Sequence, residues 1–384
     1  KEHIPRCRKE QAQQSFWTAI DQSLTKADQM DNRLQFDELI RSLTSSSNDI
    51  RKAAEASFEQ LCATPENALP LLCASMTQSE DETVRAMTAV MFRKRVGEDF
   101  FSKLSPESQS AVKSTLINAV QQERVQSVRR KIADTAGEVA AMILGKSEWP
   151  EMLNFLLQLG KSEFAEMRES SMLILSRLTF AVSDKLLPMV ATLAGLFQGT
   201  LQDQQSKEVR LAALTAASSL IQALSNLEDQ LQHLQVLIPA MFGVVGGALN
   251  EQDEESARSA LEDLISVAEE APKFFRRSMD PLVHMCFTIA DAKQLENETR
   301  FLAVEMLLTL SEQAPAMMRK QTTFLNNIVP LALQLMLVVD EVDPAAWNST
   351  TDDDDDDDMT SLDVGKDCLD RLPPSLGGQG TFPP

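Results

Sequence analysis

An arginine-centred pattern recurs seven times along this chain and limits its possible folds more than any other feature. In each copy, a small or apolar residue precedes an arginine, and an apolar stripe follows it. In six of the seven copies, an acidic residue stands shortly before the arginine. The arginines are separated by 34, 44, 39, 42, 48 and 42 residues: Arg51, Arg85, Arg129, Arg168, Arg210, Arg258 and Arg300. A period near 40 predicts a repeat array whose units are pairs of helices.

The residues that follow each arginine support helices rather than strands. After Arg210, an apolar stripe with a spacing of three to four residues places its members on one helix face: Ala213, Ala216, Ala217, Leu220 and Leu224. Glycine is sparse, and hairpin turn signals between alternating runs are missing. One helix pair cannot bury its own apolar face, so neighbouring pairs must stack. We therefore predict an all-α fold, a HEAT-repeat α-solenoid in which antiparallel helix pairs form a superhelix.

The same pattern divides the chain into four parts. We expect an N-terminal extension or capping helix over 1–33, about seven and a half HEAT helix pairs over 34–339, an acidic loop over 340–358 and a truncated C-terminal segment over 359–384. Proline and glycine punctuate the last segment, so we expect its helix to end before the run that starts at Leu372. Because the first residue is not methionine, we expect the chain to be a fragment.

The acidic loop is the least ordinary stretch of the sequence. It holds ten carboxylates and no basic residue, and seven of the ten are adjacent, from Asp352 to Asp358. Seven adjacent carboxylates repel one another and cannot all be buried, so we predict that this stretch is a solvated loop. Its role stays open between a docking surface for a basic partner and a solvated spacer, since a calcium loop needs spaced ligands and a glycine that are absent here.

The charge balance and the scarce reactive residues exclude several functions. The net charge is −21, which argues against nucleic acid as a partner and favours basic proteins. Three histidines and five scattered cysteines form no catalytic or zinc pattern, and the two Gly-Lys-Ser triplets lack the glycine of a phosphate-binding loop. The most apolar run, 328–339, is too short to span a membrane. We predict a protein that is not an enzyme, binds no metal or cofactor and does not associate with membranes.

Three stretches together resemble one family. They are VRAMTAVMFRKRV at 84–96, the aspartate run with the nearby Trp347, and LDRL…LGG at 369–378. In this order they resemble the importin-β karyopherins, of the importin-5 (importin β-3) type. The resemblance implies a nuclear transport receptor that acts as a monomer and shuttles between cytoplasm and nucleus. Its implied partners are GTP-bound Ran, cargo proteins with basic nuclear localisation signals and the Phe-Gly repeats of nucleoporins.

The resemblance also implies where Ran binds. The acidic loop would contact its basic patch through Trp347, Asp352, Asp353, Asp354, Asp355, Asp356, Asp357 and Asp358. The concave surface of the first repeats supplies six further candidates: Arg51, Arg85, Arg93, Lys94, Arg95 and Arg129. For the cluster Arg93 to Arg95, two roles stay open: contact with a partner, or a purely structural role in which the cations complement the dipole at a helix C-terminus. The alternative for the whole chain is a HEAT scaffold of the phosphatase or vesicle-coat type, without a transport role.

Overall fold

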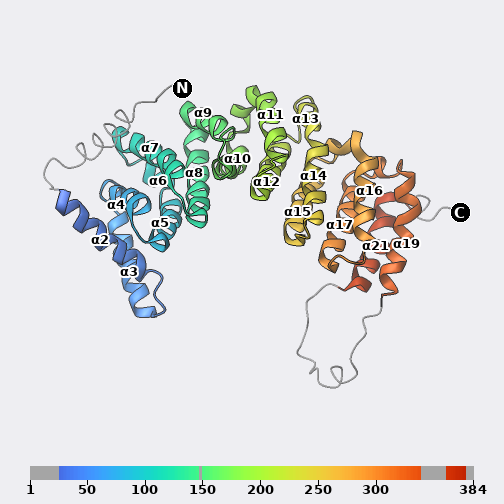
Figure 1. The fold of residues 1–384 in the computed structure, drawn as a ribbon, viewed down its shortest axis with the longest axis horizontal. Coiled ribbons are helices and arrows are strands. Elements are labelled where there is room, and N and C mark those ends of the chain that lie inside the picture. Colours follow the sequence, from blue (N-terminus) through green and yellow to red (C-terminus); the bar gives the residue numbers. More distant parts are fainter. Residues whose placement is uncertain (1–25, 147–148, 339–359, 378–384) are drawn as a thin grey trace, which may run out of the picture. The chain divides into compact units, whose positions relative to one another are not determined.

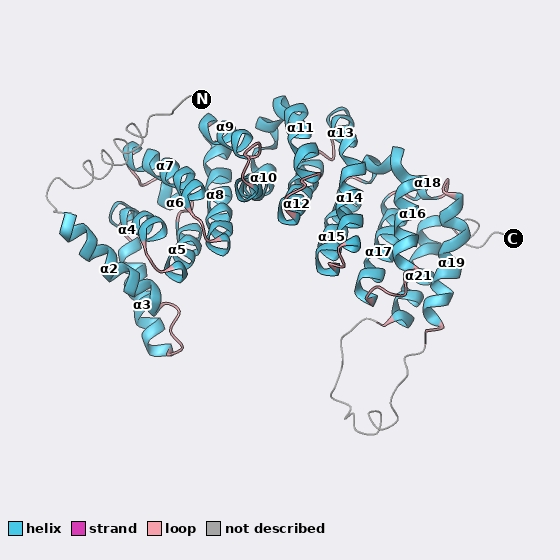
Figure 2. Cartoon of the chain, in the orientation of Figure 1, coloured by secondary structure: helices cyan, strands magenta, loops and turns pink. Residues whose placement is uncertain are grey.

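The computed structural model describes residues 26–146, 149–338 and 360–377, and within these ranges the chain consists of helices and turns without any strand (Figures 1 and 2). The chain divides into two compact units, residues 1–181 and residues 182–384. The boundary falls inside helix α10 (Ala165–Leu186), where Val182 has non-helical backbone angles (φ −131°, ψ 21°).

Unit 1 contains four helix pairs. Their first helices are α2, α4, α7 and α9, and their second helices are α3, α5, α8 and α10. The bounds are α2 (Lys26–Ser42), α3 (Asn48–Cys62), α4 (Pro65–Gln78), α5 (Glu82–Arg95), the short α6 (Glu98–Phe101), α7 (Pro106–Gln122), α8 (Gln126–Lys146), α9 (Pro150–Leu159) and α10.

Unit 2 continues the alternation with four more pairs, whose first helices are preceded by short helical turns. The bounds are η1 (Leu187–Met189), α11 (Val190–Leu201), α12 (Lys207–Ala223), α13 (Glu228–Leu234), η2 (Gln235–Leu237), α14 (Ile238–Asn250), α15 (Glu254–Glu270), η3 (Pro272–Ser278), α16 (Met279–Ala290), α17 (Asn297–Gln313), α18 (Pro315–Met318), α19 (Thr322–Met336) and α21 (Ser361–Leu376). The predicted helix pairs are confirmed.

Within each unit, the helices form two layers. A second helix contacts its own first helix and also the second helix of the next pair, as α12, α15 and α17 do in unit 2. It is therefore buried on more than one side, and α12 buries Ala212, Ala216 and Leu220 together with most of its other apolar residues. Small residues allow the close approach of neighbouring helices, which explains the alanines of the predicted stripe.

Proline in the first turn, or serine or aspartate at the N-cap, begins many of these helices. Pro65, Pro106 and Pro150 each occupy the first turn, where a missing N–H costs no hydrogen bond. Ser105 caps α7 by accepting a hydrogen bond from the Ser108 N–H at 3.2 Å.

The last helix extends further than the sequence indicated. Helix α21 continues through Pro373 and Pro374 to Leu376, so the expectation that it ends before Leu372 is wrong. Its buried stripe runs along the whole helix: Val364, Cys368, Leu372 and Leu376. A capping box at Thr360 fixes its start, and packing on α17 and α19 compensates for the backbone hydrogen bonds that the prolines remove.

One glycine makes this packing possible. A Cβ atom added to Gly365 would lie 2.6 Å from the carbonyl oxygen of Ala332 and 2.6 Å from Cγ of Met336, so α21 approaches α19 more closely than a larger residue allows. α21 is thus the second helix of the eighth pair, and the acidic run lies between the two helices of that pair in the sequence.

Two helical stretches of the described chain, Ala165–Leu201 and Glu228–Asn250, are long and apolar enough to cross a membrane by length and composition alone. Each consists of several helices joined through a 3₁₀ turn, and many of its apolar side chains, such as Leu193 and Val244, are buried in the helix array. Core helices of this kind pass the same test, so the finding is weak evidence for a membrane. That the protein does not associate with membranes stays a prediction.

Candidate partner-binding surface

The arginines that mark the repeats bind the turn between the two helices of their own pair. In four copies, the guanidinium donates to the carbonyl oxygen six residues earlier: Arg51 to Ser45 (3.1 Å), Arg85 to Ser79 (2.9 Å), Arg129 to Glu123 (3.4 Å) and Arg168 to Ser162 (2.8 Å). The carbonyl groups of a tight turn have no helical partner, so each arginine satisfies an acceptor that would otherwise lack one.

Three of the marker arginines, together with Arg130 beside Arg129 and Arg41 at the end of α2, also reach the next pair. Their carboxylate partners lie 38 to 41 residues further along the chain: Arg41 with Asp81 (3.1 Å), Arg85 with Glu123 (2.7 Å), Arg130 with Glu169 (2.6 Å), Arg210 with Glu251 (2.8 Å) and Arg258 with Glu296 (2.5 Å). We call this series the ion-pair ladder. It connects successive repeats, so the pattern that marks the repeats in the sequence also links them.

The pair of Arg85 and Glu123 is the best shielded of these. Two guanidinium nitrogens contact both carboxylate oxygens, at 2.7 and 3.1 Å, and the two side chains are only 13% and 7% exposed. Burial raises the pKa of Glu123, but the hydrogen bonds from Arg85 and from two backbone N–H groups outweigh it and lower the pKa below its usual range. Both groups are therefore charged at neutral pH.

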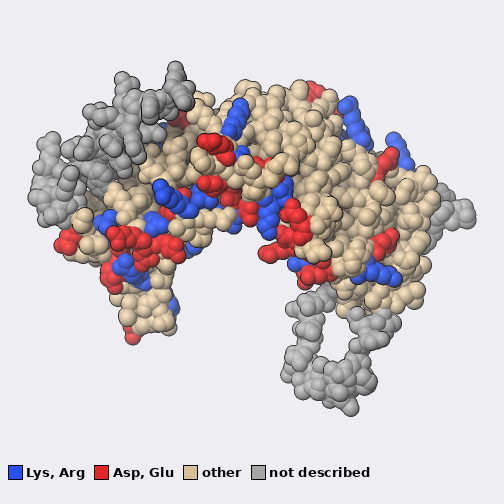
Figure 3. Space-filling model, viewed as in Figure 1, with Lys and Arg blue, Asp and Glu red and all other residues tan. Residues whose placement is uncertain are grey.

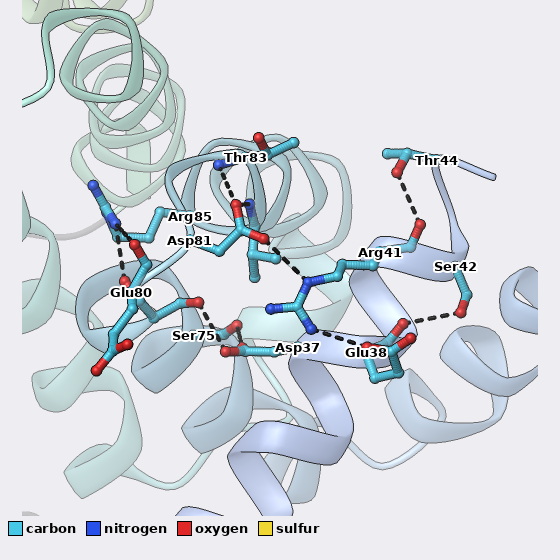
Figure 4. Close-up of polar contacts among 12 residues, drawn as sticks. Asp37, Glu38, Arg41, Ser42, Thr44, Ser75, Glu80, Asp81, Thr83 and Arg85 are labelled. Carbon is cyan, nitrogen blue, oxygen red and sulfur yellow. Dashed lines mark hydrogen bonds and ion pairs between the residues drawn. The ribbon is translucent and has the colours of Figure 1, made fainter.

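Figure 4 shows the start of the ladder between the first and second pairs. Asp81 caps α5 by accepting from the Thr83 N–H at 2.9 Å, and its other oxygen accepts from Arg41 at 3.1 Å. The bond from Arg41 is the main reason why the pKa of Asp81 is lowered. Beneath it, the buried Asp37 accepts hydrogen bonds from Ser75 and Ser79.

These contacts change the interpretation of three predicted Ran-binding residues. Arg51, Arg85 and Arg129 all donate to their own turns, and Arg129 is only 4% exposed. A partner could reach Arg85 or Arg129 only by displacing these bonds. Their assignment as partner contacts remains a prediction, but their contacts within the fold are structural.

The cluster at the end of α5 is more accessible. Arg93 lies 3.7 Å from Asp134, and Arg95 pairs with Glu59 and lies over the ring of Phe58 at 5.8 Å. Lys94 is exposed, and its side chain has no partner among the residues that the structure describes. Of the six basic candidates, Lys94 is thus the one most available to another protein.

Figure 3 shows how the basic and acidic side chains are distributed over one face of the molecule. Over the middle of unit 1, basic and acidic side chains lie next to one another, as the ion pairs of Arg93 and Arg177 with Asp134 require. Charges that neutralise one another in this way leave little to attract a partner.

The acidic candidates cannot be placed in the same way. Trp347 and the residues from Asp352 to Asp358 lie outside the described part of the chain. The structure describes the helices that precede and follow them, α19 and α21, which contact one another. Arg371 of α21 further binds Glu305 (2.6 Å) and Glu312 (2.7 Å) of α17, which raises the pKa of Arg371 and ties α21 to the seventh pair.

A half-buried aspartate was not found from the sequence. Asp263 of α15 accepts a hydrogen bond from the Thr215 hydroxyl of α12 at 2.7 Å. Burial raises its pKa to about 6, and the bond from Thr215 offsets only part of that rise. No pattern in the sequence distinguishes it, whereas the carboxylate partners of Arg85, Arg210 and Arg258 could have been found by searching 38 to 41 residues beyond these markers.

No group of three or more His, Cys, Asp or Glu side chains that could hold a metal ion occurs within the described ranges. The four cysteines that are described are free thiols: Cys62, Cys73, Cys286 and Cys368. Burial raises the pKa of three of them, Cys73, Cys286 and Cys368, to about 12, so these thiols are unreactive at neutral pH.

Two family models match the chain. One is described as "IPO5-like, TPR repeats" and matches residues 124–285, and the other is "Importin repeat" and matches residues 292–383. Importin subunit beta-3 of Saccharomyces cerevisiae is 28% identical over 362 residues, which are 89% of this chain and 32% of the relative. A probable importin-5 homolog of Dictyostelium discoideum is 26% identical over 319 residues, 81% of this chain and 29% of the relative.

The chain belongs to the importin-β family, and is of the importin-5 type. The predicted resemblance is therefore confirmed. The crystal structure of the karyopherin Kap121p matches 94% of this chain and 34% of that chain, with a TM-score of 0.79 and 26% identity. This match confirms the HEAT-repeat solenoid. Kap121p has also been solved bound to RanGTP, to Nup53p and to Pho4p, and these structures match with TM-scores of 0.76, 0.77 and 0.75. The chain spans about a third of the length of the relatives that it matches.

Proposed function

We propose that this karyopherin is a nuclear transport receptor that binds GTP-bound Ran, cargo with basic localisation signals and nucleoporin Phe-Gly segments, and shuttles between cytoplasm and nucleus. The observation that carries the proposal is the match of 94% of the chain to a solved karyopherin. It acts by binding rather than by catalysis, and requires no cofactor, metal, nucleic acid or membrane.

The first element of the proposal is a two-part contact with Ran. The aspartates from Asp352 to Asp358 attract a basic patch on Ran, and the exposed Lys94 at the end of α5 contributes a second contact. A loop with seven adjacent carboxylates acts over a longer range than a single ion pair, so its main effect is on the rate of association and on its salt dependence.

The salt dependence tests the part that the aspartates play. Replacing Asp352 to Asp358 by serine and glycine should weaken Ran-GTP binding and flatten its dependence on salt, because screening acts on exposed charges. If the salt slope of the variant equals that of the unchanged chain, the aspartates are a spacer.

The second element is a groove for Phe-Gly segments in unit 1. A cavity of about 460 Å³ lies between the first helices α7 and α9, and Ile117, Trp149, Pro150 and Lys113 are among the residues that line it. The Lys113 ammonium lies over the Trp149 ring at 5.6 Å. Most of the other lining residues are polar, so the cavity offers an aromatic ring apolar contacts at Ile117 and Pro150 and offers the flanking peptide groups hydrogen-bond partners.

Capture of the chain on immobilised Phe-Gly repeats tests the transport role against that of a HEAT scaffold of another kind. We expect capture by Phe-Gly repeats and none by matched Ser-Gly repeats, and we expect Ile117→Asp to reduce it. Capture of neither, or of both equally, would remove the transport role from this chain.

A further inference from the structure

Two basic pairs occupy equivalent places at the start of the seventh and eighth helix pairs of unit 2. Arg276 and Arg277 end η3, three and two residues before α16 begins. Arg319 and Lys320 follow α18, three and two residues before α19 begins. The two basic pairs are thus in register, one repeat apart.

Nothing in the described fold explains these four cations. All four side chains are exposed, and none takes part in a hydrogen bond or ion pair with another described residue. They lie near the positive ends of the dipoles of α16 and α19, where a cation is unfavourable, although they complement the C-terminal ends of the much shorter η3 and α18. The fold therefore gains little or no stability from them.

Several other helices at the start of a pair begin with acidic residues instead. Glu66, Glu107 and Glu151 occupy the first turns of α4, α7 and α9, and Glu228 and Asp229 that of the short α13, whereas the first turns of α11 and α14 hold no acidic residue. At the two basic starts, residues 271–280 and 314–323 together hold five basic residues and one acidic residue, Asp280. On a chain with a net charge of −21, this is a local reversal of sign.

The two basic pairs form one surface. Helix α16 contacts α19, and helices in contact have axes about 8 to 10 Å apart, so the equivalent starts are separated by roughly that distance. Figure 3 shows basic side chains along this edge of unit 2, over η3 and α18. We call the surface formed by Arg276, Arg277, Arg319 and Lys320 the basic edge.

A small cavity adjoins the basic edge. It has a volume of about 140 Å³, and it is lined by Arg276, Arg277, Lys273, Gln235 and neighbouring residues of α13. Gln235 donates to the carbonyl oxygen of Phe274 at 3.2 Å, and its own Oε1 atom is buried without a partner.

We propose that the basic edge binds an acidic polypeptide segment in extended conformation, with carboxylates about three residues apart. An extended chain rises about 3.3 Å per residue, so three residues span the distance between the basic pairs.

The small extent of the basic edge favours a short peptide over a polyanion. Nucleic acids and anionic membranes carry dense negative charge over long distances, so most of their charge would face the acidic remainder of a chain whose net charge is −21. Acidic residues beside the basic edge further limit the ligands that it can bind. Glu228 accepts a hydrogen bond from Lys273 at 2.6 Å; this bond is the main reason for its lowered pKa, to which the charge of Arg276 adds a smaller part. A short segment with few carboxylates fits such a surface.

A fluorescent ten-residue glycine peptide with three glutamates, each three residues from the next, tests the proposal by anisotropy against the full chain at low salt. We expect the peptide to bind, and its glutamine counterpart not to bind. Arg276→Glu with Arg277→Glu, and Arg319→Glu with Lys320→Glu, should each weaken binding by roughly tenfold, because two attractive contacts become repulsive. Lys293→Glu, an exposed lysine in the α16–α17 turn, is the control and should bind normally.

Thermal unfolding separates binding from folding. Because the four cations have no partner in the described fold, both double variants should melt within about 2 °C of the unchanged chain while they lose the peptide. The proposal is overturned if the glutamate peptide does not bind, if Lys293→Glu weakens it equally, or if single-stranded DNA or phosphatidylserine vesicles bind the edge more tightly than the peptide does.

Discussion

The ion-pair ladder and the basic edge both contain basic side chains, but those of the ladder are paired within the fold and those of the edge are exposed. Arg85 donates to its own turn and to Glu123 of the next pair, and little of it is exposed. Arg277 and Lys320 are exposed and contact no other described side chain through a hydrogen bond or ion pair. The first kind recurs along the sequence, because such residues link several successive helix pairs. The second kind forms two pairs of adjacent cations, at the starts of the seventh and eighth helix pairs.

In a repeat protein, whether a basic residue recurs in each repeat helps to indicate its role. A basic residue that recurs once per repeat is first a candidate for holding the repeats together, and the predicted concave-surface residues Arg51, Arg85 and Arg129 all have such contacts. A basic residue that departs from the pattern of its neighbours is the better candidate for a partner. Lys94 and the basic edge are of this second kind.

The largest effect should follow from breaking the best-shielded rung of the ladder. Glu123→Ala leaves the Arg85 guanidinium buried without its carboxylate and also removes the acceptor of two backbone N–H groups. We expect a loss of about 3 kcal/mol in the free energy of unfolding, measured with urea at pH 7.

Glu251→Ala is the matched control for that rung. Glu251 is 52% exposed and pairs with Arg210, so its loss should cost about 0.5 kcal/mol. The pKa of Glu123 is lowered in the folded state, so its contribution is present above the ordinary pKa of glutamate and is lost as the pH falls further. Equal costs for the two variants would show that shielding does not distinguish the rungs.

An intermediate effect should come from Asp263, a half-buried anion without a cation. Its folded pKa of about 6 lies above the ordinary value of 3.8, so the folded chain binds this proton more tightly than the unfolded chain does. The contribution of Asp263 to stability is therefore greatest below about pH 3.8 and is lost as the pH rises through 6. Asp263→Asn should stabilise the chain by about 2 kcal/mol at pH 8 and leave it unchanged at pH 4.

Thermal unfolding at the two pH values measures this difference, with Glu269→Gln, at an exposed position of the same helix, as control. If Asp263→Asn has the same effect at pH 4 and at pH 8, the carboxyl does not titrate as its burial requires.

The smallest effect should come from the basic edge. Arg277→Ala with Lys320→Ala should change the free energy of unfolding by less than about 0.5 kcal/mol, because neither side chain contacts a partner within the described ranges. A loss near that of Glu123→Ala would mean that the edge is structural, and the comparison between the two kinds of basic residue would fail.

The fold could be predicted from the sequence because its signal repeats. Seven arginines and the stripes behind them specify helix pairs, and the prolines at Pro65, Pro106 and Pro150 mark helix starts. The course of α21 could not be predicted in the same way. Two prolines normally end a helix, and here the packing that outweighs them depends on Gly365 and on contacts with α17 and α19.

The candidate site was less predictable for a related reason. Whether an arginine is available depends on a carboxylate some 40 residues away, and composition does not reveal that distance. Asp263 is similar, because its pKa follows from burial against α12 and from one hydroxyl group, Thr215. The family resemblance supplied the partners, but not which side chains the fold leaves exposed to meet them.

The decisive measurement for a transport role is the affinity of the chain for Ran in its two nucleotide states. We expect Ran with a non-hydrolysable GTP analogue to bind at least about tenfold more tightly than Ran with GDP, a difference of about 1.4 kcal/mol or more. Equal affinities for the two states, or no binding of the GTP form, would contradict the assignment of this chain as a Ran-responsive transport receptor.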